Sequence, residues 1–430
     1  MGGKAILLVV VSFSLTFLLI GNNFNRMSLS ALDNMAYYAS RQVAHNIALS
    51  GANIACNKFY RDTTWKAGYT NVPCQGGTYS VRVQTVDVIN EVRRITSIST
   101  FTGYYTGYAG IVYHDTIIIT FQPASFARFV YYSVKEVGGI YWSTGDTLTG
   151  PLHSQDYIFI QGSPYFYGYV STLMGIFWHG GTINEPTFAG GYQEGVDIPI
   201  NNMGVSTDSA AARMGGKYFT GHDTVYMKFV SDSIKYRYTW NGVDSTRRLS
   251  TFAPNGVIYV DRGTIRIKGV VKGQYTVSCS GVNANQGGQI WLDDDLVYTQ
   301  NPLEYPDNTD VLGLVAQNNI YVTDNAANGG GIGINIDGSL YCQGGSFIGQ
   351  NYNNGGVRGY INLIGGVIQN NRGQINTTSA EIVIKGWNKN YKFDTRLVYM
   401  SPPVFPRSGG SQIISWYESG LNAATDRNLY

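Results

Sequence analysis

An uncharged, strongly apolar segment near the start of the chain limits the possible folds more than any other feature. No charged residue occurs from Ala5 to Asn25, and residues 5–20 read AILLVVVSFSLTFLLI. This run approaches the roughly 20 apolar residues that an α-helix needs to cross a bilayer. Lys4 precedes the run and Arg26 follows it. A helix that is apolar all round has to be buried, so we expect it to lie in lipid or against copies of itself.

A removable secretory signal peptide is the alternative interpretation, with Lys4 as its short basic region. No convincing A-x-A cleavage motif follows the run, so we expect the segment to be retained as a membrane anchor or fibre core. Each large apolar side chain in it would contribute about 1.5–3 kcal/mol when fully buried. The residues expected in this assembly core are Ile6, Leu7, Leu8, Val9, Val10, Val11, Phe13, Leu15, Phe17, Leu18, Leu19 and Ile20.

The helical pattern continues beyond the apolar run. From Leu29 to Ala55, apolar residues recur mostly at three- and four-residue steps, and no proline interrupts them. This spacing predicts an amphipathic shaft. Together the two parts would form one helix of about 55 residues, on the order of 80 Å long. A break near Gly21-Asn22-Asn23, which would separate an anchor from a second helix, is the alternative.

Strand patterns follow the helix. Tyr79, Val81 and Val83 alternate with polar residues, and further runs occupy residues 94–100 and 111–121. Antiparallel hairpins packed over an amphipathic helix would bury the apolar faces of both.

This order of elements resembles the type IV pilin and pseudopilin superfamily. The resemblance covers roughly residues 1–123 and depends on the apolar helix, on SGANIA at 50–55, and on the pair GGTYSVRV … RITSIST. It implies a shaft helix on a small antiparallel sheet and a filament assembled through the apolar helix. Copies of the same chain, the inner membrane before assembly, and the secretion or pilus assembly machinery are the implied partners. The family usually has a glutamate at the fifth mature position, where this chain, counted from Met1, has Ala5.

Beyond residue 123 helical periodicity is almost absent. Apolar runs of three to five residues, such as GVIYV at 256–260 and IGINI at 332–336, alternate with Gly, Asn and Asp turns at irregular spacings. This pattern predicts stacked β-solenoid coils, and a jelly roll or other sandwich is the alternative. The arrangement also resembles an uncharacterised bacterial surface domain that follows pilin-like anchors.

The expected fold class is therefore α+β followed by mainly β. We expect an anchor and shaft helix over 1–60, a pilin-like antiparallel sheet over 61–123, a β-rich linker or accessory region over 124–250, and a β-solenoid-like surface domain over 251–430.

Composition narrows the function. Charged residues make up 13% of the chain, about half the usual share, and 30 basic against 28 acidic residues give a net charge of +2. This balance gives no attraction to nucleic acid. The 43% of hydrophobic residues excludes intrinsic disorder. The 53 glycines and 33 tyrosines suit fibres and surfaces better than cytosolic enzymes.

No motif indicates an enzyme or a cofactor. The chain has no G-x-S-x-G, no C-x-x-C and no histidine pair at ligand spacing. Asp293, Asp294 and Asp295 are a weak candidate for a Ca²⁺ site, and a solvated turn is the preferred interpretation.

The four cysteines allow two disulfides in three possible pairings. Cys56 and Cys74 could connect the shaft to the first strand, and Cys279 and Cys342 could bridge coils. An exported chain makes oxidation plausible, and buried free thiols are the alternative.

These observations predict a structural subunit of an extracellular filament, anchored in the membrane before assembly. The alternative function is a membrane-anchored or minor, tip-located pilin-like protein that binds carbohydrate or other surfaces. We expect the clustered tyrosines to serve subunit contacts or strand packing rather than sugar binding.

Overall fold

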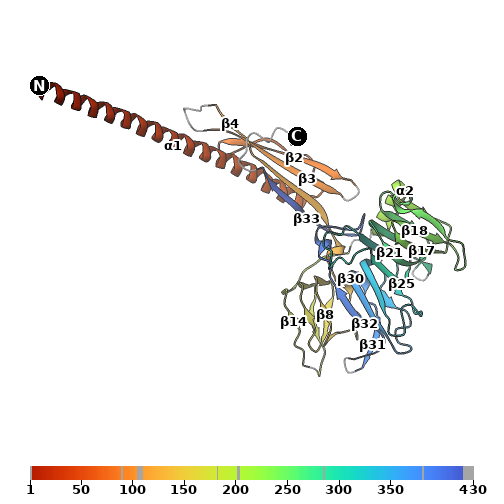
Figure 1. The fold of residues 1–430 in the computed structure, drawn as a ribbon. Coiled ribbons are helices and arrows are strands. Elements are labelled where there is room, and N and C mark those ends of the chain that lie inside the picture. Colours follow the sequence, from red (N-terminus) through yellow and green to blue (C-terminus); the bar gives the residue numbers. More distant parts are fainter. Residues whose placement is uncertain are drawn as a thin grey trace. The chain divides into compact units, whose positions relative to one another are not determined.

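The computed structural model describes residues 2–88, 91–103, 110–181, 183–200, 204–283, 286–379 and 382–419 (Figure 1). The chain forms two compact units, and the second is inserted into the first. Unit 1 comprises Met1–Gln122 and Ser411–Tyr430, and unit 2 comprises Pro123–Gly410. A long N-terminal helix followed by a large, mostly β region is therefore observed, as expected from the sequence.

Unit 1 begins with a single uninterrupted helix, α1 (Gly2–Arg61). Its 60 residues span on the order of 90 Å. The alternative of two helices with a break at residues 21–23 is wrong, because these residues are helical. One glycine inside a helix costs only about 1 kcal/mol relative to alanine, and no proline is present to interrupt the hydrogen bonds.

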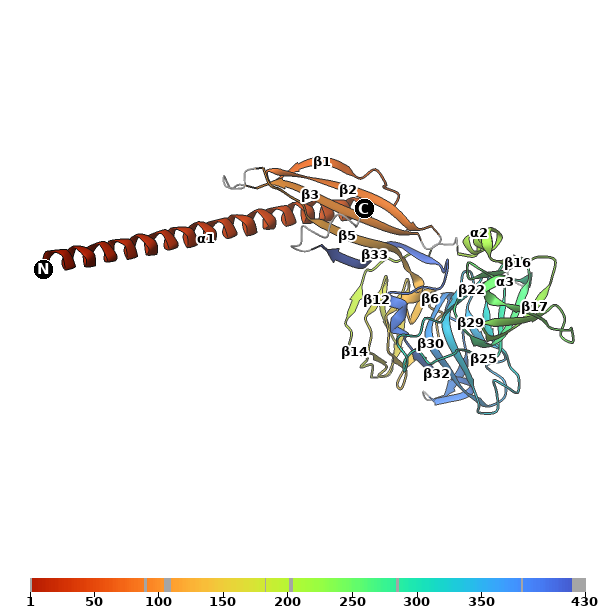
Figure 2. The same cartoon turned by 45° about the horizontal axis from the view of Figure 1, so that its top comes forward.

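An antiparallel sheet lies along the C-terminal half of α1 (Figure 2). Its strands follow the order β1-β2-β3-β5-β33, and β4 pairs with β3. The expected third strand over 111–121 is divided in the structure between β4 and β5. The bounds are β1 (Tyr69–Cys74), β2 (Gly77–Asp87), β3 (Val92–Thr102), β4 (Val112–Tyr113), β5 (Thr116–Ser125) and β33 (Arg407–Glu418).

Small residues let this helix and sheet approach closely. Ala44, Ala48, Ala52 and Ala55 are buried along one side of α1 and belong to one apolar cluster with the inward side chains of the sheet. Gly51 lies at a close approach, because a Cβ built there would lie 2.6 Å from Ser97 Oγ and 2.7 Å from the Tyr79 ring.

Unit 2 is built mainly from strands that pair in parallel, rung on rung. In the longest ladder, each strand is hydrogen-bonded to the next one along the stack. In spatial order these strands are β16 (Lys217–Phe219), β20 (Val257–Val260), β22 (Gln274–Cys279), β26 (Val311–Ala316), β28 (Ile334–Cys342), β30 (Val357–Asn371), β6 (Tyr131–Lys135), β9 (Leu152–Ser154), β12 (Val170–Thr172) and β15 (Tyr192–Glu194).

Further parallel ladders run beside the first. One contains β17 (Thr224–Ser231), β21 (Thr264–Val271), β25 (Ile290–Tyr298), the first halves of β28 and β30, β32 (Ile382–Lys392), β8 (Thr147–Leu148), β11 (Tyr165–Phe166) and β14 (Thr187–Phe188). Short ladders join β25 to β27 (Ile320–Val322) and β29 (Phe347–Gly349), and β7 (Trp142–Ser143) to β10 (Tyr157–Gln161) and β13 (Gly175–Trp178).

The remaining elements attach to these ladders. Strands β18 (Ser233–Arg237), β19 (Ser245–Arg248) and β31 (Asn376–Ser379) add antiparallel pairs, and β23 (Gly281–Asn283) pairs with β24 (Gln286–Gly287). Helix α2 (Gly204–Gly215) packs on β16, β20 and β22. Helix α3 (Leu249–Phe252) and the 3-10 turns η2 (Phe126–Arg128) and η3 (Thr395–Val398) complete the unit.

The chain builds the stack as two arms that meet in its middle. The first arm runs from β6 outward to β15, and the second runs from β16 at the opposite end back to β30. The arms join where Val367 of β30 pairs with Tyr131 of β6. The expected separation of a linker region at 124–250 from a solenoid-like domain at 251–430 therefore differs from the structure, in which strands of both segments share one sheet and one core. The backbone groups on both edges of β6 are paired, because β30 lies along one edge and β9 along the other.

Candidate assembly surface

The apolar half of α1 is exposed on every side. The twelve residues expected in the assembly core have exposed fractions from 46% (Ile20) to 70% (Phe17). Every residue of the helix from Gly3 to Leu32 is exposed, so a length on the order of 45 Å carries no packed neighbour in the described part of unit 1. This length exceeds the roughly 30 Å hydrocarbon thickness of a bilayer.

Two hydroxyl groups in this segment donate to carbonyl groups of the helix itself. The Ser12 hydroxyl donates to the carbonyl of Leu8 at 2.8 Å, and the Thr16 hydroxyl donates to the carbonyl of Ser12 at 2.8 Å. Asp33 is the first acidic residue of the chain. The helix is long and apolar enough to cross a membrane, and none of its most apolar 18-residue window is buried. The hydroxyls of Ser12 and Thr16 can therefore enter an apolar environment with their hydrogen bonds already made.

The second half of α1 is fixed to the sheet by buried polar contacts. The Ser97 hydroxyl donates to the carbonyl of Ala48 at 2.8 Å. His45 Nδ1 lies 2.6 Å from Asp115 Oδ2, and the Ser419 hydroxyl donates to Asp115 Oδ1 at 2.5 Å. Helix α1, the residue before β5 and the residue after β33 thus meet at one carboxylate. Sequence reasoning missed this cluster, because it joins residues as far apart as His45 and Ser419 and no local pattern connects them.

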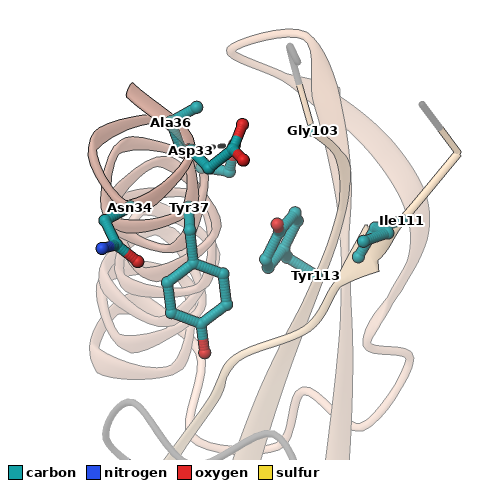
Figure 3. Close-up of a pocket in the computed structure, with 8 residues that line it drawn as sticks. Asp33, Asn34, Ala36, Tyr37, Gly103, Ile111 and Tyr113 are labelled. Carbon is teal, nitrogen blue, oxygen red and sulfur yellow. Dashed lines mark hydrogen bonds between the residues drawn. The ribbon is translucent and has the colours of Figure 1, made fainter. Parts of the chain in front are cut away.

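A groove of about 340 Å³ lies between α1 and the β3–β4 strands (Figure 3). Asp33, Asn34 and Tyr37 line it from the helix, and Ile111 and Tyr113 line it from the strand side. The rings of Tyr37 and Tyr113 meet edge to face with centroids 5.9 Å apart. The groove begins where the exposed half of α1 ends, so it adjoins the apolar surface described above.

The three consecutive aspartates lie on β25 and have separate partners. Asp293 pairs with Arg266 at 2.5 Å, Asp294 pairs with Lys268 at 3.2 Å, and Asp295 accepts from the backbone and side-chain nitrogens of Asn335 at 2.8 and 2.9 Å. The preferred interpretation as a turn is wrong, because all three belong to a strand. Within the described residues no group of three or more His, Cys, Asp or Glu side chains is placed to hold a metal ion.

All four cysteines are free in the structure. Cys279 and Cys342 align with Ala316 of the strand between them, which puts their Cα atoms about 9–10 Å apart and beyond disulfide reach. Burial raises the pKa of both thiols, and it raises the pKa of Cys56 to about 11. Cys56 and Cys74 are half-buried in unit 1, and a bridge between them stays a prediction.

Comparisons with known proteins establish no family for this chain. No family model matches it, and no curated protein matches it. Among solved structures, it is similar to the crystal structure of the competence-associated pilin ComZ from Thermus thermophilus, with 12% sequence identity and a TM-score of 0.40. That alignment covers 88% of this chain and 98% of the other. The TM-score is too low to serve as support for a shared function.

Proposed function

We propose that this chain is a pilin-like structural subunit of an extracellular filament of the type IV pilus kind. The observation that carries the proposal is the geometry of α1. Its first half is apolar and exposed on every side, and its second half packs on an antiparallel sheet through alanines. A helix of this kind is stable in water only after its free half is covered, and copies of the same helix or lipid can cover it.

Assembly through α1 has a sufficient driving force. Each large apolar side chain that becomes fully buried contributes about 1.5–3 kcal/mol, and the twelve residues of the assembly core lie within four and a half turns. Before assembly the same surface would hold the subunit in the inner membrane, with the helix spanning the bilayer. The pilus assembly machinery would then transfer it from lipid into the bundle of helices.

Unit 2 would form the surface domain of the filament. We interpret its parallel ladders as the coils of a β-solenoid, because the strands of a jelly roll or immunoglobulin-like sandwich pair antiparallel. With 13% charged residues, neighbouring copies would repel one another little. Structural assembly, rather than enzymatic turnover, would then be the role of the protein.

A single substitution in the assembly core tests the proposal. Val10→Asp places a carboxylate in the middle of the apolar run, where burial among other helices costs at least about 2.5–3.5 kcal/mol. We expect cells that produce this variant to form no fibres, scored by electron microscopy of sheared material. Val243→Asp, the same change at a valine of unit 2 that is 93% exposed, is the matched control and should leave fibres intact.

The membrane fraction of the same cells separates failed assembly from failed insertion. Val10→Asp protein that reaches the membrane without forming fibres is the expected result. Fibres of normal number and length from Val10→Asp cells would contradict the proposal. Absence of fibres from wild-type cells, with the chain confined to the membrane, would favour the anchored binding protein instead.

A further inference from the structure

A second groove lies in unit 2 beside the junction of the two arms. Its volume is about 490 Å³, within the range of about 300–1,000 Å³ typical of small-molecule sites. The loop before β8, the end of β10, the turn after β30 and strand β32 form its walls. The groove therefore depends on segments from both arms, which only the stacked fold brings together.

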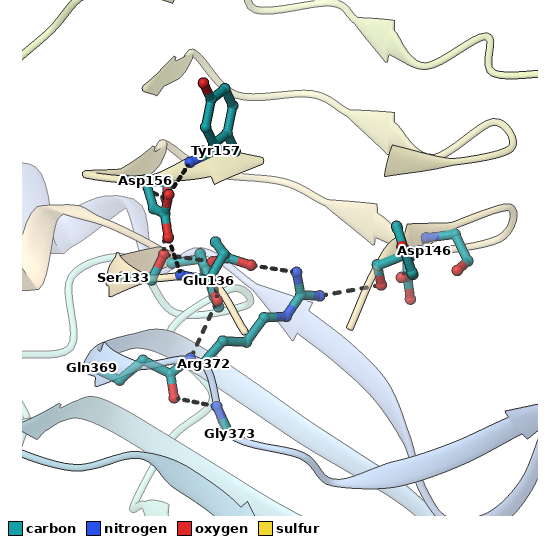
Figure 4. Close-up of polar contacts among 12 residues, drawn as sticks. Ser133, Glu136, Asp146, Asp156, Tyr157, Gln369, Arg372 and Gly373 are labelled. Carbon is teal, nitrogen blue, oxygen red and sulfur yellow. Dashed lines mark hydrogen bonds and ion pairs between the residues drawn. The ribbon is translucent and has the colours of Figure 1, made fainter. Parts of the chain in front are cut away.

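The charged groups at this groove form two ion pairs, of which Figure 4 shows the one between Arg372 and Glu136. Arg372 Nη1 lies 2.7 Å from Glu136 Oε2, and both side chains are almost fully buried. Lys389 Nζ lies 3.3 Å from Asp146 Oδ2. Arg372 also donates to the carbonyl of Tyr141 at 3.3 Å. Two cations and two anions compensate each other, so the site offers no net charge to attract a phosphate, a metal ion or a nucleic acid.

Neutral hydrogen-bonding groups provide most of the recognition chemistry. Gln161, Thr377 and Asn388 line the groove. Among the described residues, the side chains of Gln161 and Thr377 form no hydrogen bond, and Asn388 has only a long contact of 3.5 Å to a carbonyl. Asn376 uses its Nδ2 to donate to the carbonyl of Trp387 at 2.9 Å, which leaves its Oδ1 able to accept. Amides and hydroxyls of this kind supply both donors and acceptors to an uncharged ligand.

Aromatic rings extend from the groove over the neighbouring strands. Tyr360 lines the groove and is 53% exposed, and Tyr141 lines it from the opposite arm. The ring of Tyr141 meets Phe159 with centroids 5.9 Å apart, and Phe159 meets Phe177 at 4.9 Å. Phe159 and Phe177 pair directly in the β10–β13 ladder. The three rings thus form a row on the outer face of successive rungs, which we call the ring row.

We propose that this groove and the ring row bind a neutral oligosaccharide. Sugars present many hydroxyls around the edge of the ring and C–H groups on its faces, which match amides and aromatic faces respectively. A second protein would fit less well, because interface cores are depleted in such polar groups and each one left unpaired would cost about 1–3 kcal/mol. Saccharide binding by unit 2 does not require filament assembly, so either proposal can fail without the other.

Titration calorimetry on the full-length protein tests sugar binding. The protein is held in a zwitterionic detergent, because a glycoside detergent would itself present sugar. The probes are hexasaccharides of β-1,4-linked glucose, α-1,4-linked glucose, β-1,4-linked mannose and β-1,4-linked N-acetylglucosamine. We expect at least one of them to bind, with a dissociation constant in the micromolar to millimolar range.

Two substitutions and a matched control locate the binding. Tyr360→Ala should weaken it by about tenfold or more, and Gln161→Ala by about three- to tenfold. Tyr305→Ala removes a tyrosine of similar exposure, 51%, which does not line the groove, and should leave affinity unchanged. Tyr360 is half-exposed, and the side chain of Gln161 has no hydrogen bond among the described residues, so both variants should melt like the wild type.

Three results would overturn the proposal. One is the absence of heat from all four hexasaccharides at millimolar concentration. Another is binding that both Tyr360→Ala and Gln161→Ala leave intact. The third is that the two variants differ from the wild type in self-association, measured by light scattering, but not in sugar affinity. That result would identify the surface as a contact between copies of this chain.

Discussion

At the scale of single residues, burial separates two kinds of ionisable side chain in unit 2. Glu136 and Arg372 are buried together and compensate each other at 2.7 Å. Asp337 is buried without an ion-pair partner among the described residues, and its Oδ2 accepts from the backbone nitrogen of Tyr298 at 2.8 Å. Desolvation raises the pKa of this carboxyl to about 6, and the hydrogen bond from Tyr298 opposes the rise only in part.

The raised pKa makes Asp337 a source of pH-dependent instability. The pKa of this carboxyl is about 6 in the folded state and near 3.8 in the unfolded state. Its contribution to the stability of the fold is therefore fully present below about pH 4, where the carboxyl is protonated, and is lost as the pH rises through about 6. Asp337→Asn keeps the acceptor and removes the charge. We expect the variant to gain stability relative to the wild type between pH 4 and pH 7, by up to about 3 kcal/mol.

Urea unfolding of both proteins at several pH values measures this difference. Asp307→Asn, which removes a carboxylate from an exposed turn, controls for the change in net charge. A wild-type protein that is more stable than Asp337→Asn at pH 7, or a difference that does not vary with pH, would contradict this account of the buried carboxyl.

Single residues also show where sequence reasoning succeeds. The exposed apolar residues 5–20 are consecutive in the chain, so the sequence alone could predict that they form one apolar helical segment. The partners of Asp293, Asp294 and Asp295 could not be predicted, because they are Arg266, Lys268 and Asn335, each on a neighbouring rung. The sequence shows which polar and charged residues are present, but the register of the strands decides which of them form ion pairs or hydrogen bonds.

At the scale of elements, the contact between α1 and its sheet depends on residue size. Gly51→Ala would place a methyl group 2.6 Å from Ser97 Oγ and 2.7 Å from the Tyr79 ring. The overpacking costs about 1–3 kcal/mol, and the better helix propensity of alanine returns at most about 1 kcal/mol. We expect faster hydrogen exchange of the backbone amides in β2 and β3, because the helix that covers them is displaced.

The same substitution elsewhere on α1 provides the control. A Cβ at Gly21 would meet nothing within 4 Å, so Gly21→Ala should leave exchange in β2 and β3 unchanged. Equal protection of these strands in the wild type and in Gly51→Ala would show that the tight approach of helix and sheet is not important for stability.

Local patterns predicted some elements and missed others. The alternation in 79–83 and the run at 94–100 predicted β2 and β3, since one face of each is buried against α1. A local pattern cannot place β33 in this sheet, because its neighbour β5 lies nearly three hundred residues earlier in the chain. In unit 2, short apolar runs predicted short strands, but their order in the stack depends on contacts between the two arms.

At the scale of the whole molecule, unit 2 is inserted between β5 and β33 of unit 1. Both connections leave neighbouring strands of the small sheet, so the helix and sheet of unit 1 remain complete around the insertion. This organisation permits a large second unit without changes to α1. The exposed, apolar half of α1 is a large surface of unit 1 that needs a partner in water.

Negative-stain microscopy of material sheared from cells, with mass spectrometry of the same material, tests the filament assignment most directly. We predict fibres composed chiefly of this chain, with peptides from residues 5–20 released only after the fibres are dissociated. A chain that stays in the membrane fraction, or that occurs as a trace component in fibres of another protein, would contradict its role as the structural subunit.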